Sequence, residues 1–180
     1  FQLPPYLEWK PAVLDYLEWA QAQLRGDRML VEFRNRTFFE DGVRDQMLRF
    51  LEERGMAYVT VDAPRLAAKN VPLTVVATTS PLAYVRFHGR NARTWNIRGA
   101  ASSAERFDWL YAPEELSEWV EPLARLAAST DEVYGLFNNN NQDQAPRGAA
   151  VLRRLLDEAG VSATGGLEPE PPEPLAPTLF

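Results

Sequence analysis

Three segments of the chain, residues 29–34, 57–62 and 82–88, alternate polar with apolar side chains, and helical sequence lies between such segments. A period of two is typical of a β-strand, because successive side chains point to opposite faces of a sheet. Strands that alternate with helices form βαβ units, in which the strands run parallel and helices cover the sheet. The polar members of the alternation are Glu32, Arg34, Tyr58, Thr60, Asp62, Tyr84, Arg86 and His88. We expect these side chains to share one face of the sheet and to form a polar site near the strand ends.

Periodicity and turn residues predict the remaining elements. Helices are expected at residues 9–24, 41–54 and 149–159, and a helix that opens at Pro113 should bend or split at Pro122. Strands are expected at residues 1–3 and 132–137, with a short strand near residues 73–77. Four complete strands cannot close an eight-stranded barrel, so an open α/β sheet of four or five strands is the self-contained alternative.

The composition fits one globular domain and excludes several kinds of functional site. The chain of 180 residues has 46% hydrophobic and 24% charged residues, which is enough apolar sequence for one sizeable core. Twenty-five acidic residues against nineteen basic ones give a formal net charge of −6, which argues against a protein that coats nucleic acid. The absence of cysteine excludes disulfides, thiolate nucleophiles and cysteine-bound zinc. No apolar run approaches the ~20 residues of a membrane span, and we expect a cytoplasmic protein.

The chain divides into a domain and a tail. Residues 1–160 hold the predicted strands and helices, and Gly160 ends the last helix. Residues 161–180 are rich in proline and glutamate and contain no basic residue, which is typical of an extended or disordered segment. The final residues 176–180 resemble a sliding-clamp-binding peptide but lack its leading glutamine and leucine, so we expect a plain tail.

Six motifs occur in a fixed order along the chain. They are FQLPP at 1–5, VEFRN at 31–35, VDAP at 61–64, YVRFHGRN at 84–91, FDWLY at 107–111, and FNNN with QAP at 137–146. In this order they resemble the YecE-like family, domain of unknown function 72. The resemblance spans residues 1 to about 158 and implies a TIM-barrel-like (β/α)8 fold. It also implies that this chain is the C-terminal portion of the domain, with about the last four to five β/α units. The activity of the family is not established, so the resemblance implies a fold rather than a reaction.

Glu32 and Arg34 share one strand face and form the first candidate pair. Near the carboxyl end of their strand they would point into the mouth of a barrel, where TIM-barrel sites lie. Glu32 could act there as a general base, and Arg34 could clamp a carboxylate or phosphate. An internal ion pair is the alternative. Asp62 ends the next strand and is predicted to be a second carboxylate facing Glu32, with capping of the following turn as its alternative.

A second cluster surrounds the only histidine of the chain. His88 is the side chain type that titrates near neutrality and is predicted to move a proton. Arg86 and Arg90 would hold an anion, and Gly89 would let the backbone approach the ligand. The alternative is that His88 bonds a neighbouring carboxylate and only fixes the strand end.

Loops after the strands supply further candidates. In the turn after residues 132–137, Asn139 is chosen over Asn138 as the amide that contacts the ligand. The loop of residues 90–111 mixes arginine with aromatic residues, and we expect a lid whose aromatic side chains pack on the barrel rim. Stacking of these side chains on nucleic acid is the alternative. The loop residues in question are Arg93, Trp95, Arg98, Arg106, Phe107, Trp109 and Tyr111.

No metal or cofactor is predicted. Glu32, Asp62 and His88 could form a carboxylate–histidine metal site. Arg34 and Arg86 are interleaved with them and oppose a bound cation. The sequence also lacks a dinucleotide fingerprint and a phosphate-binding glycine loop.

These observations predict a site for a small anionic ligand that bears a phosphate, carboxylate or sugar. One of the two carboxylates would be the base, His88 the proton donor, and the three arginines Arg34, Arg86 and Arg90 the clamp. Should the protein be an enzyme, the predicted chemistry is cofactor-independent hydrolysis or isomerisation. The alternatives are a protein that binds or processes nucleic acid and a barrel that binds without catalysis.

Overall fold

The computed structural model describes residues 1–24, 26–66, 70–95 and 102–165. Within these ranges the elements are α1 (Pro11–Gln23), β1 (Leu30–Val31), the 3₁₀ helix η1 (Arg36–Phe39), α2 (Val43–Arg54), β2 (Ala57–Asp62), β3 (Leu82–Phe87), α3 (Ser103–Arg106), α4 (Pro113–Ser117), α5 (Val120–Ser129), β4 (Glu132–Phe137) and α6 (Gln144–Glu158). The predicted tail from residue 166 onward, with its clamp-like end, lies outside the described residues. None of the helices described is both long enough and apolar enough to cross a membrane.

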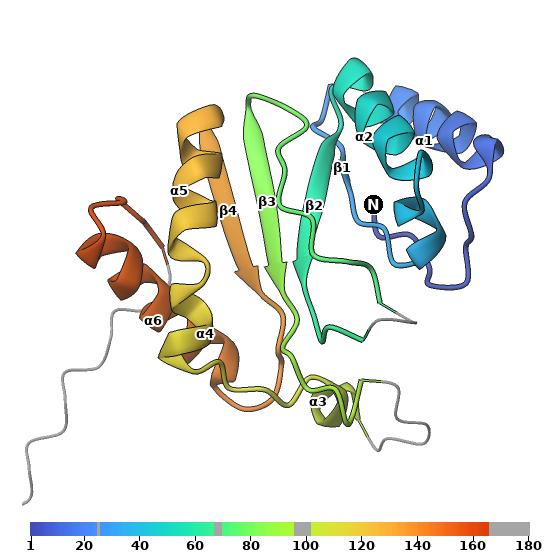
Figure 1. Ribbon diagram of the computed structural model, residues 1–180. Helices are drawn as coiled ribbons and strands as arrows, with labels where there is room; N and C mark the ends of the chain where they lie inside the picture. The colour runs from blue at the N-terminus through green and yellow to red at the C-terminus, as the bar shows by residue number, and fades with distance from the viewer. Residues whose placement is uncertain (25, 67–69, 96–101, 166–180) are drawn as a thin grey trace, which may run out of the picture.

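The four strands are parallel, and their order in the sheet is their order along the chain, β1-β2-β3-β4. An isolated parallel bridge between Gln2 and Glu32 sets the segment predicted as a strand end beside β1. Since the strands point the same way, their carboxyl ends lie at one edge of the sheet, where α3 is found at the bottom of Figure 1. The prediction of a parallel α/β fold is confirmed.

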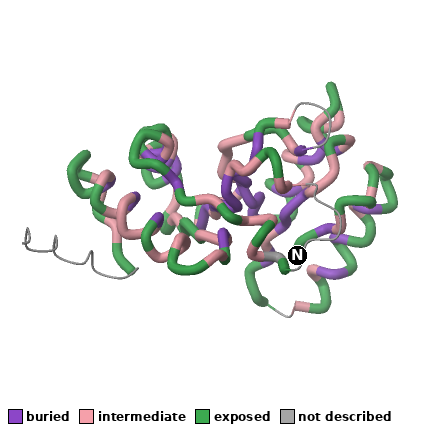
Figure 2. Tube along the Cα trace, turned by 90° about the horizontal axis from the view of Figure 1, so that it is seen from below, coloured by how far each residue is buried: buried purple, intermediate pink, exposed green. Residues whose placement is uncertain are grey.

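Two hydrophobic clusters hold the helices against the sheet. One joins α1 and α2 to β1 and includes Leu17, Val31, Phe33, Met47 and Leu51. The other joins α4, α5 and α6 to β3 and β4 and includes Val85, Phe87, Leu116, Leu123 and Leu152. Figure 2 shows buried positions along the central strands, with exposed helical surface to either side. Full burial of one such side chain stabilises the fold by about 1.5–3 kcal/mol.

The strand register divides the sheet into two faces. The helix face packs against the helices and carries Val31, Phe33, Tyr58, Thr60, Asp62, Val85 and Phe87. We call the opposite face the cavity face, because a cavity lies against it. This face carries Glu32, Arg34, Val59, Val61, Arg86, His88, Leu136 and Asn138. The register sets Asp62 opposite Phe87 and Val61 opposite Arg86. The prediction that the polar residues of all three segments share one face is therefore wrong for β2.

Three elements differ from their predicted extent. β1 is limited to Leu30–Val31, and beyond it the chain keeps only the bridge from Glu32 to Gln2. Residues 73–77 form no strand, and the carbonyl of Thr74 accepts a hydrogen bond from the Thr60 hydroxyl instead. The helix predicted at 41–54 begins after Gly42, so Asp41 is not its cap.

The helix that opens at Pro113 is split as predicted. α4 ends at Ser117 and α5 begins at Val120, which leaves Pro122 in the first turn of α5. A proline there removes no intrahelical hydrogen bond. α6 begins at Gln144, earlier than the predicted residue 149, and has Pro146 in its first turn for the same reason.

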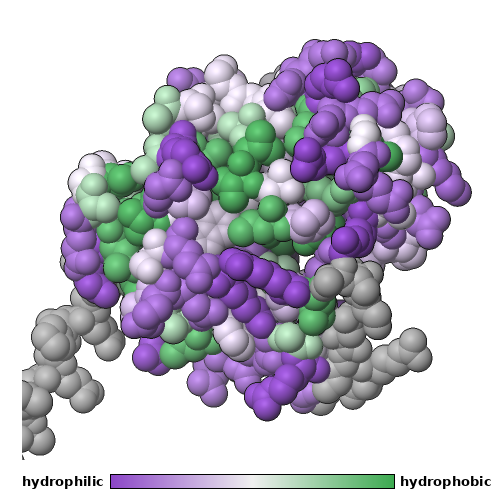
Figure 3. Space-filling model, viewed as in Figure 1, coloured by the Kyte–Doolittle hydropathy of each residue, from purple (hydrophilic) through white to green (hydrophobic). Residues whose placement is uncertain are grey.

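The cavity face of β4 is exposed to solvent. Tyr134 and Leu136 are 47% and 45% exposed, and within the described part of the chain β4 has a hydrogen-bonded neighbour, β3, on one side only. Figure 3 shows hydrophobic residues near the middle of the face in view, over the sheet. An edge strand with exposed apolar side chains is a surface that favours association with another strand.

Candidate functional site

Glu32, Arg86 and His88 meet on the cavity face at the carboxyl ends of β1 and β3. The Glu32 carboxylate accepts hydrogen bonds from Gln2 Nε2, at 2.7 Å, and from Arg86 Nη1. His88 Nε2 lies 3.6 Å from Glu32 Oε1. The strand between them, β2, presents the aliphatic side chain of Val61 on this face, so the charged side chains reach across it. The sequence expectation that Glu32, Arg86 and His88 lie close together is confirmed.

The Glu32 carboxyl is held in its ionised form. It is 3% exposed, and this burial raises its pKa. The hydrogen bonds from His88 and Gln2, with the charges of His88 and Arg86, together outweigh burial and lower the pKa from 4.5 to about 2. A carboxylate with so low a pKa accepts protons poorly. The site therefore favours an electrostatic role for Glu32 over the role of a base.

Two guanidinium groups face this one carboxylate. Arg34 Nε lies 3.9 Å from Glu32 Oε1, and its side chain stays 32% exposed. Arg86 pairs with the other carboxylate oxygen of Glu32. Its Nε is buried and has no hydrogen-bond partner among the described residues. A buried donor without a partner is costly. Arg86 does not line the cavity, so its guanidinium acts on the site through Glu32.

The amide of Asn138, and not that of Asn139, lies beside His88. Asn138 Nδ2 is 3.2 Å from His88 Nδ1. Asn139 is fully buried and donates from Nδ2 to the carbonyl of Trp109 at 2.7 Å. Asn139 was chosen because alternation places it on the same face as Phe137. The ring of Phe137 packs with the helices, so this shared face is the helix face. Because Phe137 is apolar, the sequence could have indicated that Asn138 faces the cavity instead.

Asp62 and Arg90 form an ion pair on the helix face. Arg90 Nε donates to both carboxylate oxygens of Asp62, at 3.1 and 3.0 Å, and Arg90 Nη1 donates to Glu118 at 3.1 Å. Burial raises the pKa of Asp62 against the opposing charge of Arg90. The predicted positions of Asp62 beside Glu32 and of Arg90 in the clamp are therefore wrong.

A cavity of about 140 Å³ opens beside Glu32 and His88. Its polar lining consists of Glu32, Arg34, Asn70, His88 and Arg106, and its apolar lining includes Phe33, Val61, Val71, Trp95 and Phe107. The pockets of drug-sized ligands measure about 300–1,000 Å³, so this cavity suits a smaller molecule.

The loop after β3 supplies an aromatic wall for the cavity. The rings of Trp95 and Phe107 lie 5.7 Å apart at 80°, an edge-to-face arrangement. Both rings also approach the imidazole of His88, with centroids at 6.2 and 6.0 Å. The aromatic residues of the predicted lid thus close one side of the cavity.

The base of this loop is fixed to the strand ends. Gly89 N–H donates to the Tyr111 hydroxyl at 3.0 Å, and Trp109 N–H donates to Gln144 Oε1 at 2.9 Å. Arg106 lines the cavity and Arg93 is exposed, whereas Arg98 lies outside the described residues. The described part of the loop therefore has the packing expected of a lid.

Among the described residues, no three histidine, aspartate or glutamate side chains lie close enough together to hold a metal ion. Glu32 and His88 are neighbours, but Asp62, the third residue considered from sequence, lies on the other face. The arginines beside Glu32 would also oppose a cation.

The sheet order, the covering helices and the cationic cavity together define a parallel α/β protein with a polar cavity at the carboxyl ends of its strands. The chain belongs to the family described as protein of unknown function DUF72, whose model matches residues 1–174. The family resemblance seen in the motifs is confirmed. That the chain is the C-terminal portion of the domain stays a prediction.

Similar proteins come from several bacteria. The UPF0759 protein YunF of Bacillus subtilis (strain 168) is 33% identical over 159 residues, which are 87% of this chain and 56% of that protein. A crystal structure of the DUF72 family protein EF0366 from Enterococcus faecalis V583 has a TM-score of 0.82 at 25% identity and is matched over 94% of this chain and 60% of its own. The DUF72 family protein TM1631 from Thermotoga maritima MSB8 has a TM-score of 0.75 at 31% identity over 87% and 56%. This chain spans less than two thirds of the length of each of these relatives.

Proposed function

We propose that the cavity beside Glu32 and His88 binds a small anionic ligand. The observation that carries the proposal is the charge balance, because the single carboxylate of Glu32 faces the guanidinium groups of Arg34 and Arg86. The surplus positive charge lies in a confined space, where water screens it less than at the surface. Arg106 also lines the cavity and adds a further guanidinium group on this side of Glu32, which supports the proposal.

His88 is the residue that we propose for proton transfer, should the ligand be converted. Imidazole takes up and releases protons near neutral pH, and this ring lines the cavity between Glu32 and Asn138. In this proposal Glu32 orients His88 and holds Arg86, and it does not serve as the base. Such chemistry needs no cofactor and suits hydrolysis or isomerisation.

A binding experiment tests the anion site. Inorganic phosphate and acetate, each added at constant ionic strength, should raise the Tm of the protein in a saturable way. The variant Arg34→Ala should weaken the apparent affinity about tenfold or more, because a charge-assisted contact is lost. Arg93→Ala removes an exposed arginine that does not line the cavity and is the matched control. Equal Tm shifts in Arg34→Ala and the unchanged protein, or no shift with either anion, would overturn the proposal.

We also propose that the sheet is part of a TIM-barrel-like fold. Strands that neighbour one another in chain order, all parallel and with helices on one face, are the arrangement of such a barrel. The cavity beside Glu32 then lies at the carboxyl ends of the strands, where the sites of this fold are found.

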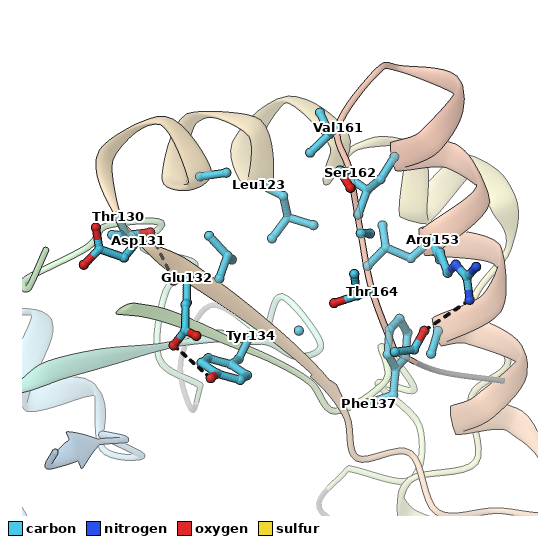
Figure 4. A pocket seen from close by; sticks show the side chains of 18 residues that line it. Leu123, Thr130, Asp131, Glu132, Tyr134, Phe137, Arg153, Val161, Ser162 and Thr164 are labelled. Atoms are coloured by element: carbon cyan, nitrogen blue, oxygen red, sulfur yellow. Dashed lines mark hydrogen bonds between the residues drawn. The ribbon is translucent and has the colours of Figure 1, made fainter. Parts of the chain in front are cut away.

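A second, larger space beside β4 supports this architecture. It measures about 510 Å³ and is bounded by β4, α5, α6 and residues 161–165. Figure 4 shows Leu123 of α5, Phe137 of β4 and Val161 around it. Its lining mixes apolar side chains with polar ones such as Thr130 and Arg153. A space next to a strand edge that has no partner among the described residues is where a further strand would pack.

A further inference from the structure

We infer that the ligand of the cavity is a small carboxylic acid that carries one flat six-membered ring. The inference rests on the proposed anion site and adds what the rest of the molecule bound there must look like. Three properties of the cavity carry it, namely its aromatic wall, its size and the excess of positive charge at its polar end.

The aromatic wall provides the surface for a ring. Trp95 and Phe107 line the cavity, and their edge-to-face contact holds both rings in place. Val61 and Val71 add aliphatic surface to this lining. A flat apolar ring gains dispersion contacts with such surfaces.

The volume limits the ligand to one ring. An apolar cavity of about 150 Å³ in another protein holds a benzene molecule, and the cavity here measures about 140 Å³. Acetate or inorganic phosphate would leave much of this space without contacts. A nucleotide, with a base, a sugar and a phosphate, would not fit inside it.

The polar end has more positive than negative charge. Arg34 and Arg106 line the cavity with Glu32, and Arg86 pairs with Glu32 from beside the cavity, so guanidinium groups outnumber the one carboxylate. A ligand carboxylate is attracted to this end of the cavity and matches the planar fork of a guanidinium.

The test measures the binding of four probes by isothermal titration calorimetry and by NMR. The probes are benzoate, cyclohexanecarboxylate, acetate and inorganic phosphate. Benzoate should bind about tenfold or more tightly than acetate, because the ring buries apolar surface. It should also bind more tightly than cyclohexanecarboxylate, whose ring is thicker. The proton signals of bound benzoate should move upfield, because they lie over the rings of Trp95 and Phe107.

A variant locates the effect at the wall. Trp95→Ala should abolish most of the preference for benzoate over acetate. Trp19→Ala is the matched control, because Trp19 is 60% exposed on α1 and does not line the cavity. Should Trp95→Ala fail to fold, the ranking of probes on the unchanged protein still decides the matter.

The outcomes separate this inference from the anion site itself. Equal affinities for benzoate and acetate, or tightest binding of phosphate or cyclohexanecarboxylate, would overturn the inference that the ligand carries a flat ring. The proposed anion site would still stand. A benzoate preference that survives Trp95→Ala would also overturn it. Failure of every anion to bind would overturn both proposals.

Discussion

Asp62 holds Arg90 through both of its carboxylate oxygens, at 3.1 and 3.0 Å, on the face of the sheet opposite the cavity. The main-chain oxygen of Asp62 also accepts the N–H of His88 at 2.9 Å. The chain crosses between the two faces at Gly89, which has a φ of 87°. One residue of β2 thus fixes both neighbours of Gly89, and through them the strand end that carries His88.

Asp62→Asn is expected to lower the free energy of unfolding by about 3 kcal/mol, because it removes the buried counter-charge of a largely buried guanidinium and leaves it only the more exposed Glu115 and Glu118. Asp62 is 2% exposed and the Arg90 side chain 13% exposed. Chemical denaturation at neutral pH measures the loss. Glu118→Gln is the control, since it removes the half-exposed partner of the same arginine and should cost less than about 1 kcal/mol. Equal losses in the two variants would show that burial of the Asp62 pair is not what matters.

Gly89→Ala is expected to destabilise the protein by about 3 kcal/mol, from backbone strain and steric overlap together. A Cβ at this position would lie 2.7 Å from Cβ of Trp109. Gly55→Ala provides the matched control, because Gly55 has a φ of 63° and nothing within 4 Å of an added Cβ. That change carries the strain alone and should cost about 1 kcal/mol. Thermal unfolding of both variants measures the difference, and a Gly55→Ala loss as large as that of Gly89→Ala contradicts the proposed overlap.

Acid should remove the stabilisation that comes from Glu32. Its pKa is about 2 in the folded protein against an ordinary value of 4.5, so between these values the unfolded chain binds more protons than the folded one. The contribution, about 3 kcal/mol, is therefore fully present above pH 4.5 and is lost as the pH falls toward 2. Denaturation curves across this range measure it. Glu32→Gln should flatten the dependence, whereas the exposed Glu53→Gln should keep it.

Leu136→Lys is expected to reduce self-association of this chain at high concentration. Leu136 is 45% exposed next to Tyr134 on the edge strand β4, where apolar surface favours contact between copies. Leu73→Lys is the control, because Leu73 is similarly exposed, at 41%, but lies outside the sheet. Sedimentation velocity compares the two, and an equal effect of both changes would argue against β4 as the contact.

The charged side of the cavity could be predicted because its signal is local. Glu32, Arg86 and His88 alternate with large apolar residues within their own strands, and charged residues in such positions are rarely placed without a partner or a role. Alternation alone therefore puts each of them on the face away from its apolar neighbours. The structure keeps all three on the cavity face.

The orientation of β2 could not be predicted, because its signal is not local. Every residue of β2 is buried, so neither face of this strand is marked by contact with water. Only the pairing of Val61 with Arg86 decides that Asp62 points toward the helices. That pairing joins residues far apart in the sequence, and a shift of one residue would have reversed the result.

The two hydrophobic clusters, one around α1, α2 and β1 and the other around α4, α5, α6, β3 and β4, share no buried residue. The contacts of Glu32 with Arg86 and His88 run from the first half to the second across β2. These polar contacts therefore connect the two halves of the molecule. A ligand bound among them would couple the unfolding of one half to that of the other. Cooperativity, the property by which a molecule melts as one unit, would then increase with occupancy of the cavity, beyond the coupling that the pairing of β1, β2 and β3 already provides.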